Sequence, residues 1–286
     1  MDNWPELRIT RARFHLKVEY VNRFMVFPEA VMRGALGYFW HDAGPRFQEL
    51  YNLVFGASRK GVQDRIATPP SGAALRCVSQ GEESVDLEIT LFGDCGAQVP
   101  LLLESLHILG YEGVGESRCR FYVEGFPDYE TKGLEEWVLA ELIGGEALPL
   151  SFEPSHGVCI DVVSPMTLRA IRGKFLMDWD TESFFRNLLQ RVRQLAEFYG
   201  TPLPQEWGTD LAEDVQRLCA SSDTRTVERT RRSSRQKSNL DYSGFLGCII
   251  LRNVSARLFD LLRMGAIVGV GKNTVMGSGC YSLTLL

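Results

Sequence analysis

Hydrophobic and polar residues alternate along several short segments of this chain, the pattern of strands with one buried face. The clearest segment is RFHLKVEY, residues 13–20, in which every second residue is apolar. The same period predicts strands at residues 73–78, 85–92 and 119–126. Apolar residues at helical spacing predict a helix that begins at Pro28 and is stopped by Gly44-Pro45, and another at residues 99–109. The order β-α-β-β-α-β is that of a ferredoxin-like domain.

The second half of the chain repeats this order. We predict strands at residues 158–163 and 244–251, a strand through an arginine-rich run, and a closing strand at 280–285. Helices are predicted at residues 181–199, 211–218 and 255–264. A Gly-Val-Gly turn stands between a helix and a last strand in both halves, at residues 113–115 and 269–271. The alternative is a coincidence between two glycine turns.

The repeat predicts an α+β fold with two tandem ferredoxin-like (RRM-like) βαββαβ domains. The first comprises residues 1–126, and the second comprises residues 157–286 and carries a glycine-rich loop near its end. Residues 127–156 contain seven acidic residues and one lysine, and we interpret them as a connector with a helix of its own near residues 134–142.

The glycine-rich loop does not fit a nucleotide-binding P-loop. A P-loop has glycine five residues before Gly271 and Ser or Thr after Lys272, whereas this chain has Ala266 and Asn273. A P-loop also opens a helix, whereas the residues after Lys272 predict a loop and then a strand. Any phosphate bound here is expected to belong to a longer molecule than a nucleotide.

Charge is distributed unevenly along the chain. The net charge is −5, but residues 225–286 contain ten Lys or Arg and three Asp or Glu, whereas the preceding residues carry an excess of acids. The densest stretch is RTVERTRRSSRQK, residues 225–237. A basic face on an acidic body binds polyanions, because salt screens the more distant charges. The alternative is a solvated loop.

Composition favours a cytoplasmic protein. The chain has 286 residues, 45% of them hydrophobic, without a run that predicts a membrane helix or a signal peptide. Seven scattered cysteines form no Cys-x-x-Cys pair, which favours reduced, buried thiols over disulfides or a zinc site. We therefore expect neither a metal nor a cofactor.

Several segments in this order resemble the CRISPR precursor-RNA processing endoribonucleases of the RAMP superfamily. The resemblance spans residues 9–286 and is carried by MRGALGYFWH, LYNLVFG, LEITLFGDCGAQVPLLLESLHILGYEGVG, RRSSRQ, SGFLGCI and GVGKNTVMGSG. It implies paired ferredoxin-like domains whose glycine-rich loop binds CRISPR repeat RNA, and it implies possible partners among the other subunits of an effector complex. The implied RNA-binding residues are Arg231, Arg232, Arg235, Gln236, Gly269, Gly271, Lys272, Asn273, Gly277 and Gly279.

The implied reaction is cleavage by the 2′-hydroxyl of the RNA itself, which needs a base, an acid and a cation but no metal. Among four histidines, His41 closes the helix after the first strand, where members of this family commonly carry their catalytic histidine. A helix C-terminus stabilises a protonated imidazole, which suits a general acid. Tyr38 and Arg33 lie on neighbouring surface of that helix, and Lys272 completes the catalytic candidates. His41 could equally be a surface residue.

One departure from the family leaves two functions open. Many relatives have His-x-Gly-Lys in the last loop, whereas this chain has Gly269-Val270-Gly271-Lys272. The first function is a metal-independent endoribonuclease that cuts repeat RNA to mature guide RNA. The second is a non-cleaving, repeat-binding subunit of an effector complex. Proton transfer at the scissile phosphate distinguishes them.

Overall fold

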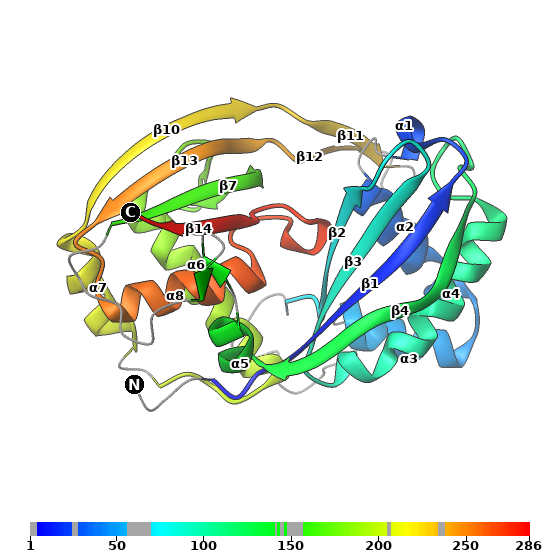
Figure 1. The fold of residues 1–286 in the computed structure, drawn as a ribbon, viewed down its shortest axis with the longest axis horizontal. Helices are drawn as coiled ribbons and strands as arrows, with labels where there is room; N and C mark the ends of the chain where they lie inside the picture. The colour runs from blue at the N-terminus through cyan, green and yellow to red at the C-terminus, as the bar shows by residue number, and fades with distance from the viewer. Residues whose placement is uncertain are drawn as a thin grey trace.

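The computed structural model describes residues 5–24, 28–55, 70–140, 142–143, 146–147, 157–204, 207–233 and 238–286. Its described elements form two four-stranded antiparallel sheets side by side, each with helices packed on one face (Figure 1). No helix in these residues is long and apolar enough to span a bilayer.

The N-terminal sheet has the strand order β2-β3-β1-β4. Its strands are β1 (Arg8–Val18), β2 (Ala73–Ser79), β3 (Ser84–Phe92) and β4 (Phe121–Gly133). The helices of this half are α1 (Val21–Phe24), α2 (Pro28–Asp42), α3 (Pro45–Phe55), η1 (Gly93–Gln98), α4 (Val99–Glu112) and α5 (Leu134–Ala140).

The C-terminal sheet has the equivalent order β10-β13-β7-β14. Its strands are β7 (Val158–Met166), β10 (Cys219–Val227), β13 (Gly244–Arg252) and β14 (Tyr281–Leu285), and its helices are α6 (Thr181–Tyr199), α7 (Trp207–Gln216), α8 (Ala256–Val268) and η2 (Thr274–Met276). Short pairs are β5–β6 (Leu142–Ile143, Glu146–Ala147), β8–β9 (Leu168–Arg169, Phe175–Leu176) and β11–β12 (Thr230–Ser233, Ser238–Asp241). The shared order confirms the predicted tandem ferredoxin-like fold.

Side-chain alternation on β1 separates the two faces of the N-terminal sheet. Ala12, Phe14 and Leu16 are buried in the core. Arg11 and Arg13, on the opposite face, line a cleft toward the C-terminal half. The amphipathic pattern of this strand therefore aims its charged side chains at the domain interface.

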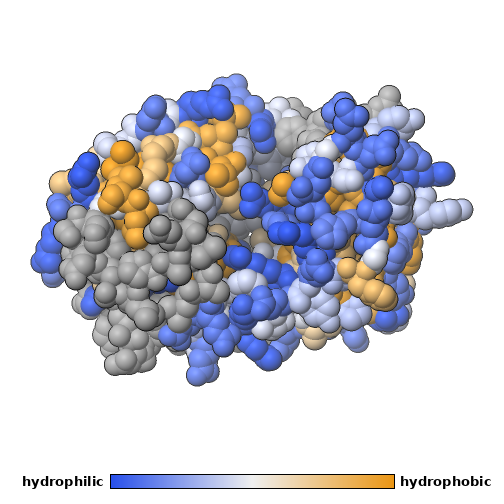
Figure 2. Space-filling view, in the orientation of Figure 1, coloured by the Kyte–Doolittle hydropathy of each residue, from blue (hydrophilic) through white to orange (hydrophobic). Residues whose placement is uncertain are grey.

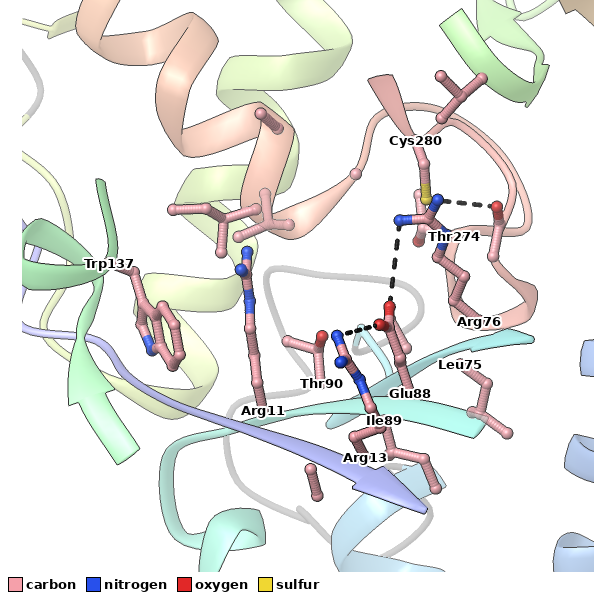
Figure 3. A pocket seen from close by; sticks show the side chains of 18 of the residues that line it. Arg11, Arg13, Leu75, Arg76, Glu88, Ile89, Thr90, Trp137, Thr274 and Cys280 are labelled. Atoms are coloured by element: carbon pink, nitrogen blue, oxygen red, sulfur yellow. Dashed lines mark hydrogen bonds and ion pairs between the residues drawn. The ribbon is translucent and has the colours of Figure 1, made fainter. Parts of the chain in front are cut away.

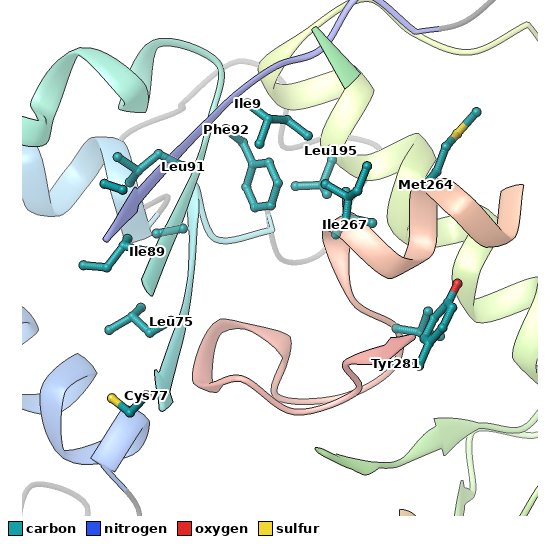
Figure 4. Packing of buried hydrophobic residues seen from close by; sticks show 14 of the residues in the cluster. Ile9, Leu75, Cys77, Ile89, Leu91, Phe92, Leu195, Met264, Ile267 and Tyr281 are labelled. Carbon is teal, nitrogen blue, oxygen red and sulfur yellow. The ribbon is translucent and has the colours of Figure 1, made fainter. Parts of the chain in front are cut away.

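An apolar cluster joins the two halves. Ile9 and Phe92 of the first sheet lie near Leu195 of α6 and Ile267 of α8 (Figure 4). The Tyr199 hydroxyl at the end of α6 donates a hydrogen bond of 2.8 Å to the Pro70 carbonyl. Apolar burial and hydrogen bonding together hold one domain against the other.

Several elements differ from the sequence predictions. The β4 strand continues to Gly133, because the residues after 126 pair with β1, and α3 was not predicted. The arginine-rich run forms the end of β10 and a separate hairpin, β11–β12, rather than one strand. The cysteines are free, as predicted, but Cys219 is exposed and only Cys77, Cys95 and Cys119 are buried.

Candidate nucleic-acid interface

The two Gly-Val-Gly turns occupy equivalent positions in the two domains. Gly113 ends α4 with a φ of 80°, and Gly269 ends α8 with a φ of 73°. Each donates its N–H to the carbonyl four residues earlier, at 2.8 Å. Left-handed residues of this kind at helix ends favour glycine. The loop that follows is longer in the second domain, running from 271 to 278 before Gly279, against 115 to 118 in the first.

Three glycines of the longer loop lie against protein backbone. A side chain at any of them would meet a carbonyl oxygen, and the pairs are Gly271 with Thr167, Gly277 with Leu75, and Gly279 with Val270. The Gly277 contact crosses from the C-terminal domain to β2 of the N-terminal domain, where Glu29 of α2 also lies. The protein's own packing therefore requires these glycines, whatever they do toward RNA.

Lys272 and Asn273 lie at the turn of the loop. The Lys272 N–H donates to the Thr167 carbonyl at 3.0 Å, and its ammonium lies 4.7 Å from the centre of the Phe175 ring. Asn273 has a φ of 64°, and its side chain donates to the Asp241 carbonyl at 3.1 Å. These contacts fix the backbone, and Lys272 as a residue stays partly exposed.

A cleft of about 870 Å³ lies between the two domains (Figure 3). The open face of the first sheet forms one wall, and the end of α8, the glycine-rich loop and β14 form the other. In the space-filling view the surface is hollowed between the two halves (Figure 2). Its charged lining includes Arg11, Arg13, Arg76, Glu88, Asp128 and Glu130.

Carboxylates neutralise several of the cleft's basic groups. The Arg13 guanidinium lies 2.8 Å from Glu88, and Arg76 lies 4.0 Å from Glu88 (Figure 3). Arg13 also lies 3.9 Å from Asp86. On the same sheet face, His15 hydrogen-bonds to Asp86 at 2.7 Å, which raises the pKa of His15 above 6.5. A polyanion entering here would have to compete with these acids.

Glu29 lies beneath the glycine-rich loop at the start of α2. Its carboxylate accepts a hydrogen bond of 3.0 Å from the Cys77 N–H, and burial raises the pKa of Glu29 above its usual value. The charges of Arg229 and Arg76 oppose part of that rise. No sequence pattern singles out Glu29 and these neighbours, because they come from different elements and share no local motif.

The catalytic candidates of α2 lie along its length. His41 is exposed at the C-terminal end, where Nδ1 lies 2.7 Å from Asp42 Oδ1 and the ring meets Tyr51 edge-on at 5.7 Å. Tyr38 is exposed one turn earlier, and the Arg33 guanidinium lies 4.6 Å from the centre of the Phe55 ring.

The glycine-rich loop touches the opposite end of α2 from His41. Gly277 meets Glu29, and His41 follows Glu29 by twelve residues on the helix, which corresponds to about 18 Å along its axis. The fold therefore does not bring the imidazole of His41 and the loop contact together. An RNA held by the loop would have to run along α2 to reach His41.

The predicted arginine run lies only partly within the described residues. Arg231 and Arg232 belong to β11, whereas Arg235 and Gln236 lie outside the described part of the chain. The β11–β12 hairpin extends from β10 and β13 toward the N-terminal domain (Figure 1). Among the described residues, no group of three or more His, Cys, Asp or Glu is arranged to hold a metal ion.

A family model described as CRISPR-associated endoribonuclease Cas6 matches residues 160–281, which include the glycine-rich loop. Residues 160–281 are therefore similar to the Cas6 family. The match confirms the family resemblance predicted from the sequence. No curated protein matches the chain.

Solved Cas6 structures share the fold of the whole chain. A Cas6 product complex is 15% identical with a TM-score of 0.61, and the match covers 99% of this chain and all of that one. Thermus thermophilus Cas6 is 16% identical with a TM-score of 0.55, covering 98% and 99% of the two chains. A chain of a partial Cas6-RT-Cas1–Cas2 complex is 12% identical with a TM-score of 0.58, covering all of this chain and 47% of that one.

Proposed function

We propose that this protein is an endoribonuclease that binds and cleaves repeat RNA in precursor CRISPR RNA to give mature guide RNA. The observation that carries the proposal is the Cas6 match over residues 160–281, because the matched region contains the glycine-rich loop that packs on the N-terminal domain. We assign residues 157–286 to the C-terminal domain, and we extend the N-terminal domain from residues 1–126 to residue 133, because β4 pairs with β1 as far as Gly133. We place RNA contacts on both domains.

The proposed chemistry needs no metal. The 2′-oxygen attacks the adjacent phosphorus as its proton passes to a base or to water, the bond from phosphorus to the 5′-oxygen breaks, and an acid protonates that oxygen. The products are a 2′,3′-cyclic phosphate and a 5′-hydroxyl. A cation beside the phosphate stabilises the charge that develops on it.

We assign the acid to His41. If Asp42 Oδ1 accepts a hydrogen bond from the Nδ1–H of His41, the other ring nitrogen, Nε2, faces the leaving oxygen. Tyr38 and Arg33 would position the RNA along α2. Lys272 is the cation of the glycine-rich loop, and Gly269, Gly271, Asn273, Gly277 and Gly279 shape its backbone.

The distance along α2 favours a second candidate function. His41 lies about 18 Å along α2 from Glu29, the residue that the glycine-rich loop touches. If RNA bound at the loop does not extend to His41, its imidazole does not reach the scissile phosphate, and the protein is a non-cleaving repeat-binding subunit. Because a similar chain is part of a Cas6-RT-Cas1–Cas2 complex, we propose other CRISPR proteins as partners for either function.

Incubation of the purified protein with end-labelled RNA of one host CRISPR repeat, in EDTA, tests the proposal. We expect a single cut within the repeat and a product with a 2′,3′-cyclic phosphate end. Tight binding without a cut would support the repeat-binding subunit, and no binding at all would contradict both functions.

A further inference from the structure

The β8–β9 hairpin carries a cluster of basic residues that belong to none of the sequence motifs and have no role in the proposed reaction. Residues 163–177 contain Arg169, Arg172 and Lys174 and no Asp or Glu. The turn is closed by hydrogen bonds from the Ala170 N–H to the Lys174 carbonyl, 2.8 Å, and from the Gly173 N–H to the Ala170 carbonyl, 2.9 Å. All three basic residues are exposed.

Helix α6 holds this hairpin in place. The Arg169 N–H donates to Asn187 Oδ1 at 3.1 Å, and the Arg169 carbonyl accepts from Asn187 Nδ2 at 2.9 Å and from Arg186. Leu168 is fully buried. The backbone under the basic side chains is therefore fixed before any ligand arrives, which lowers the entropy cost of binding.

The hairpin and the glycine-rich loop form one continuous surface. Gly271 packs on the Thr167 carbonyl, which also accepts the Lys272 N–H, and the Lys272 ammonium lies over the Phe175 ring. Lys272 therefore lies on the same surface as the three basic residues of the hairpin. In the part of the chain that the structure describes, none of the four lies within 4.0 Å of a carboxylate, in contrast to Arg13 and Arg76 in the cleft.

We propose that the β8–β9 hairpin is a second RNA-backbone contact, which holds phosphates of the strand as it leaves the glycine-rich loop. Three exposed basic side chains with no described carboxylate within 4.0 Å, together with the partly exposed Lys272, fit a polyanion. Ile171 and Phe175 are 72% and 47% exposed, so the surface also offers apolar area on which an unpaired base can lie. The inference rests on the proposed function, because the ligand is the same RNA.

Charge reversal at the hairpin tests this site. Arg172→Glu and Lys174→Glu should each weaken binding of labelled repeat RNA about tenfold or more, and should flatten the plot of log affinity against log salt by about 0.7 for each lost contact with single-stranded RNA. Arg252→Glu is the matched control, because Arg252 is also an exposed arginine but lies far from the hairpin. The first residue of β13, Gly244, packs on Met166 beside the hairpin, whereas Arg252 is the last residue of the same strand. We expect the control to change affinity less than about threefold.

Two results would overturn the inference while leaving the proposed function intact. One is wild-type protein that binds and cuts repeat RNA while both hairpin variants match Arg252→Glu. The other is that the two hairpin variants bind repeat RNA like the wild type but lose binding to phosphatidylserine-containing vesicles. This result would assign the hairpin to a lipid surface. Failure of the wild type to bind repeat RNA would overturn the proposed function and this inference together. Thermal melting of each variant verifies that it is folded.

Discussion

Gly277 of the C-terminal domain lies directly against Glu29 of the N-terminal domain. A β-carbon placed on Gly277 would lie 3.2 Å from Glu29 Cγ and 2.7 Å from the Leu75 carbonyl oxygen. Through this contact the longer of the two equivalent loops bridges from its own sheet to α2 and β2. The glycine-rich loop thus has a structural role at the domain interface, beside the role in RNA binding that we propose for it.

Gly277→Ala should destabilise the protein more than Gly125→Ala, by about 1 to 3 kcal/mol. Both glycines have left-handed backbone, with φ of 71° and 66°, so the backbone cost is matched. Only Gly277 has atoms within 4 Å of the added carbon. Urea denaturation of the two variants measures the difference. Equal losses would show that the interface adapts to the extra methyl group.

The His15–Asp86 pair should make stability depend on pH. Hydrogen bonding to Asp86 raises the folded pKa of His15, and Asp128 also faces the ring, at 3.6 Å. The stabilisation is fully present below the unfolded pKa of about 6.5 and is lost as the pH rises through the folded pKa.

We therefore expect His15→Gln to lower the free energy of unfolding more at pH 5.5 than at pH 8.5. The difference should not exceed about 1 kcal/mol, because the side chain is 42% exposed and solvent screens the pair. His107→Gln, at an exposed site on α4, is the control. A larger loss at pH 8.5 would contradict the assigned pair.

Arg191→Met should leave stability unchanged or raise it by about 1 to 4 kcal/mol. Burial lowers the pKa of Arg191 to about 10, and within the described residues its Nε and Nη2 atoms have no hydrogen-bond partner. The guanidinium lies 5.6 Å from the centre of the Phe92 ring at the domain interface. Below pH 10 the buried guanidinium is charged, which lowers the free energy of unfolding of the wild type. The stability gained by Arg191→Met should therefore shrink as the pH rises above 10.

Arg193→Met is the matched control on the same helix, because Arg193 is only partly buried and lies beside Gly208. We expect thermal melting to place Arg191→Met at or above the wild type and Arg193→Met at or below it. A loss of more than about 2 kcal/mol in Arg191→Met would show that the arginine stabilises the interface.

His41→Ala should slow single-turnover cleavage by roughly 10² or more with little change in RNA affinity, because a general acid acts in the chemical step. His107→Ala is the control for loss of an exposed helical imidazole. Lys272→Ala should weaken binding if the lysine only holds the backbone, and should slow the saturated rate if it stabilises the developing charge. Full activity of His41→Ala would remove His41 from the mechanism.

Much of the fold could be predicted from the sequence because its signals are local. Helix α6 has the predicted bounds, Thr181–Tyr199, since its amphipathic pattern is long. In the structure, Asp180 caps its first turn by accepting the Ser183 N–H. Both Gly-Val-Gly turns were predicted as equivalent. Short elements such as β8–β9 were missed, because two-residue strands have no measurable period.

The site was harder to predict because it depends on how the two domains dock. No sequence pattern places Gly277 beside Glu29, or Lys272 over Phe175, since these pairs are far apart in the chain and meet only through tertiary packing. For the same reason, the sequence does not predict that Arg13 and Arg76 both pair with Glu88 in the cleft. The roles assigned to His41, Tyr38, Arg33 and Lys272 remain predictions.

Cleavage of repeat RNA with one 2′-deoxy substitution, immediately 5′ of the scissile phosphate, tests the central claim most directly. The assay is run in EDTA with saturating protein, and a 2′-deoxy substitution two nucleotides away is the control. We predict that the substituted RNA binds normally and is not cut, whereas the control RNA is cut at the wild-type rate. Cleavage at the substituted position would contradict attack by the 2′-hydroxyl.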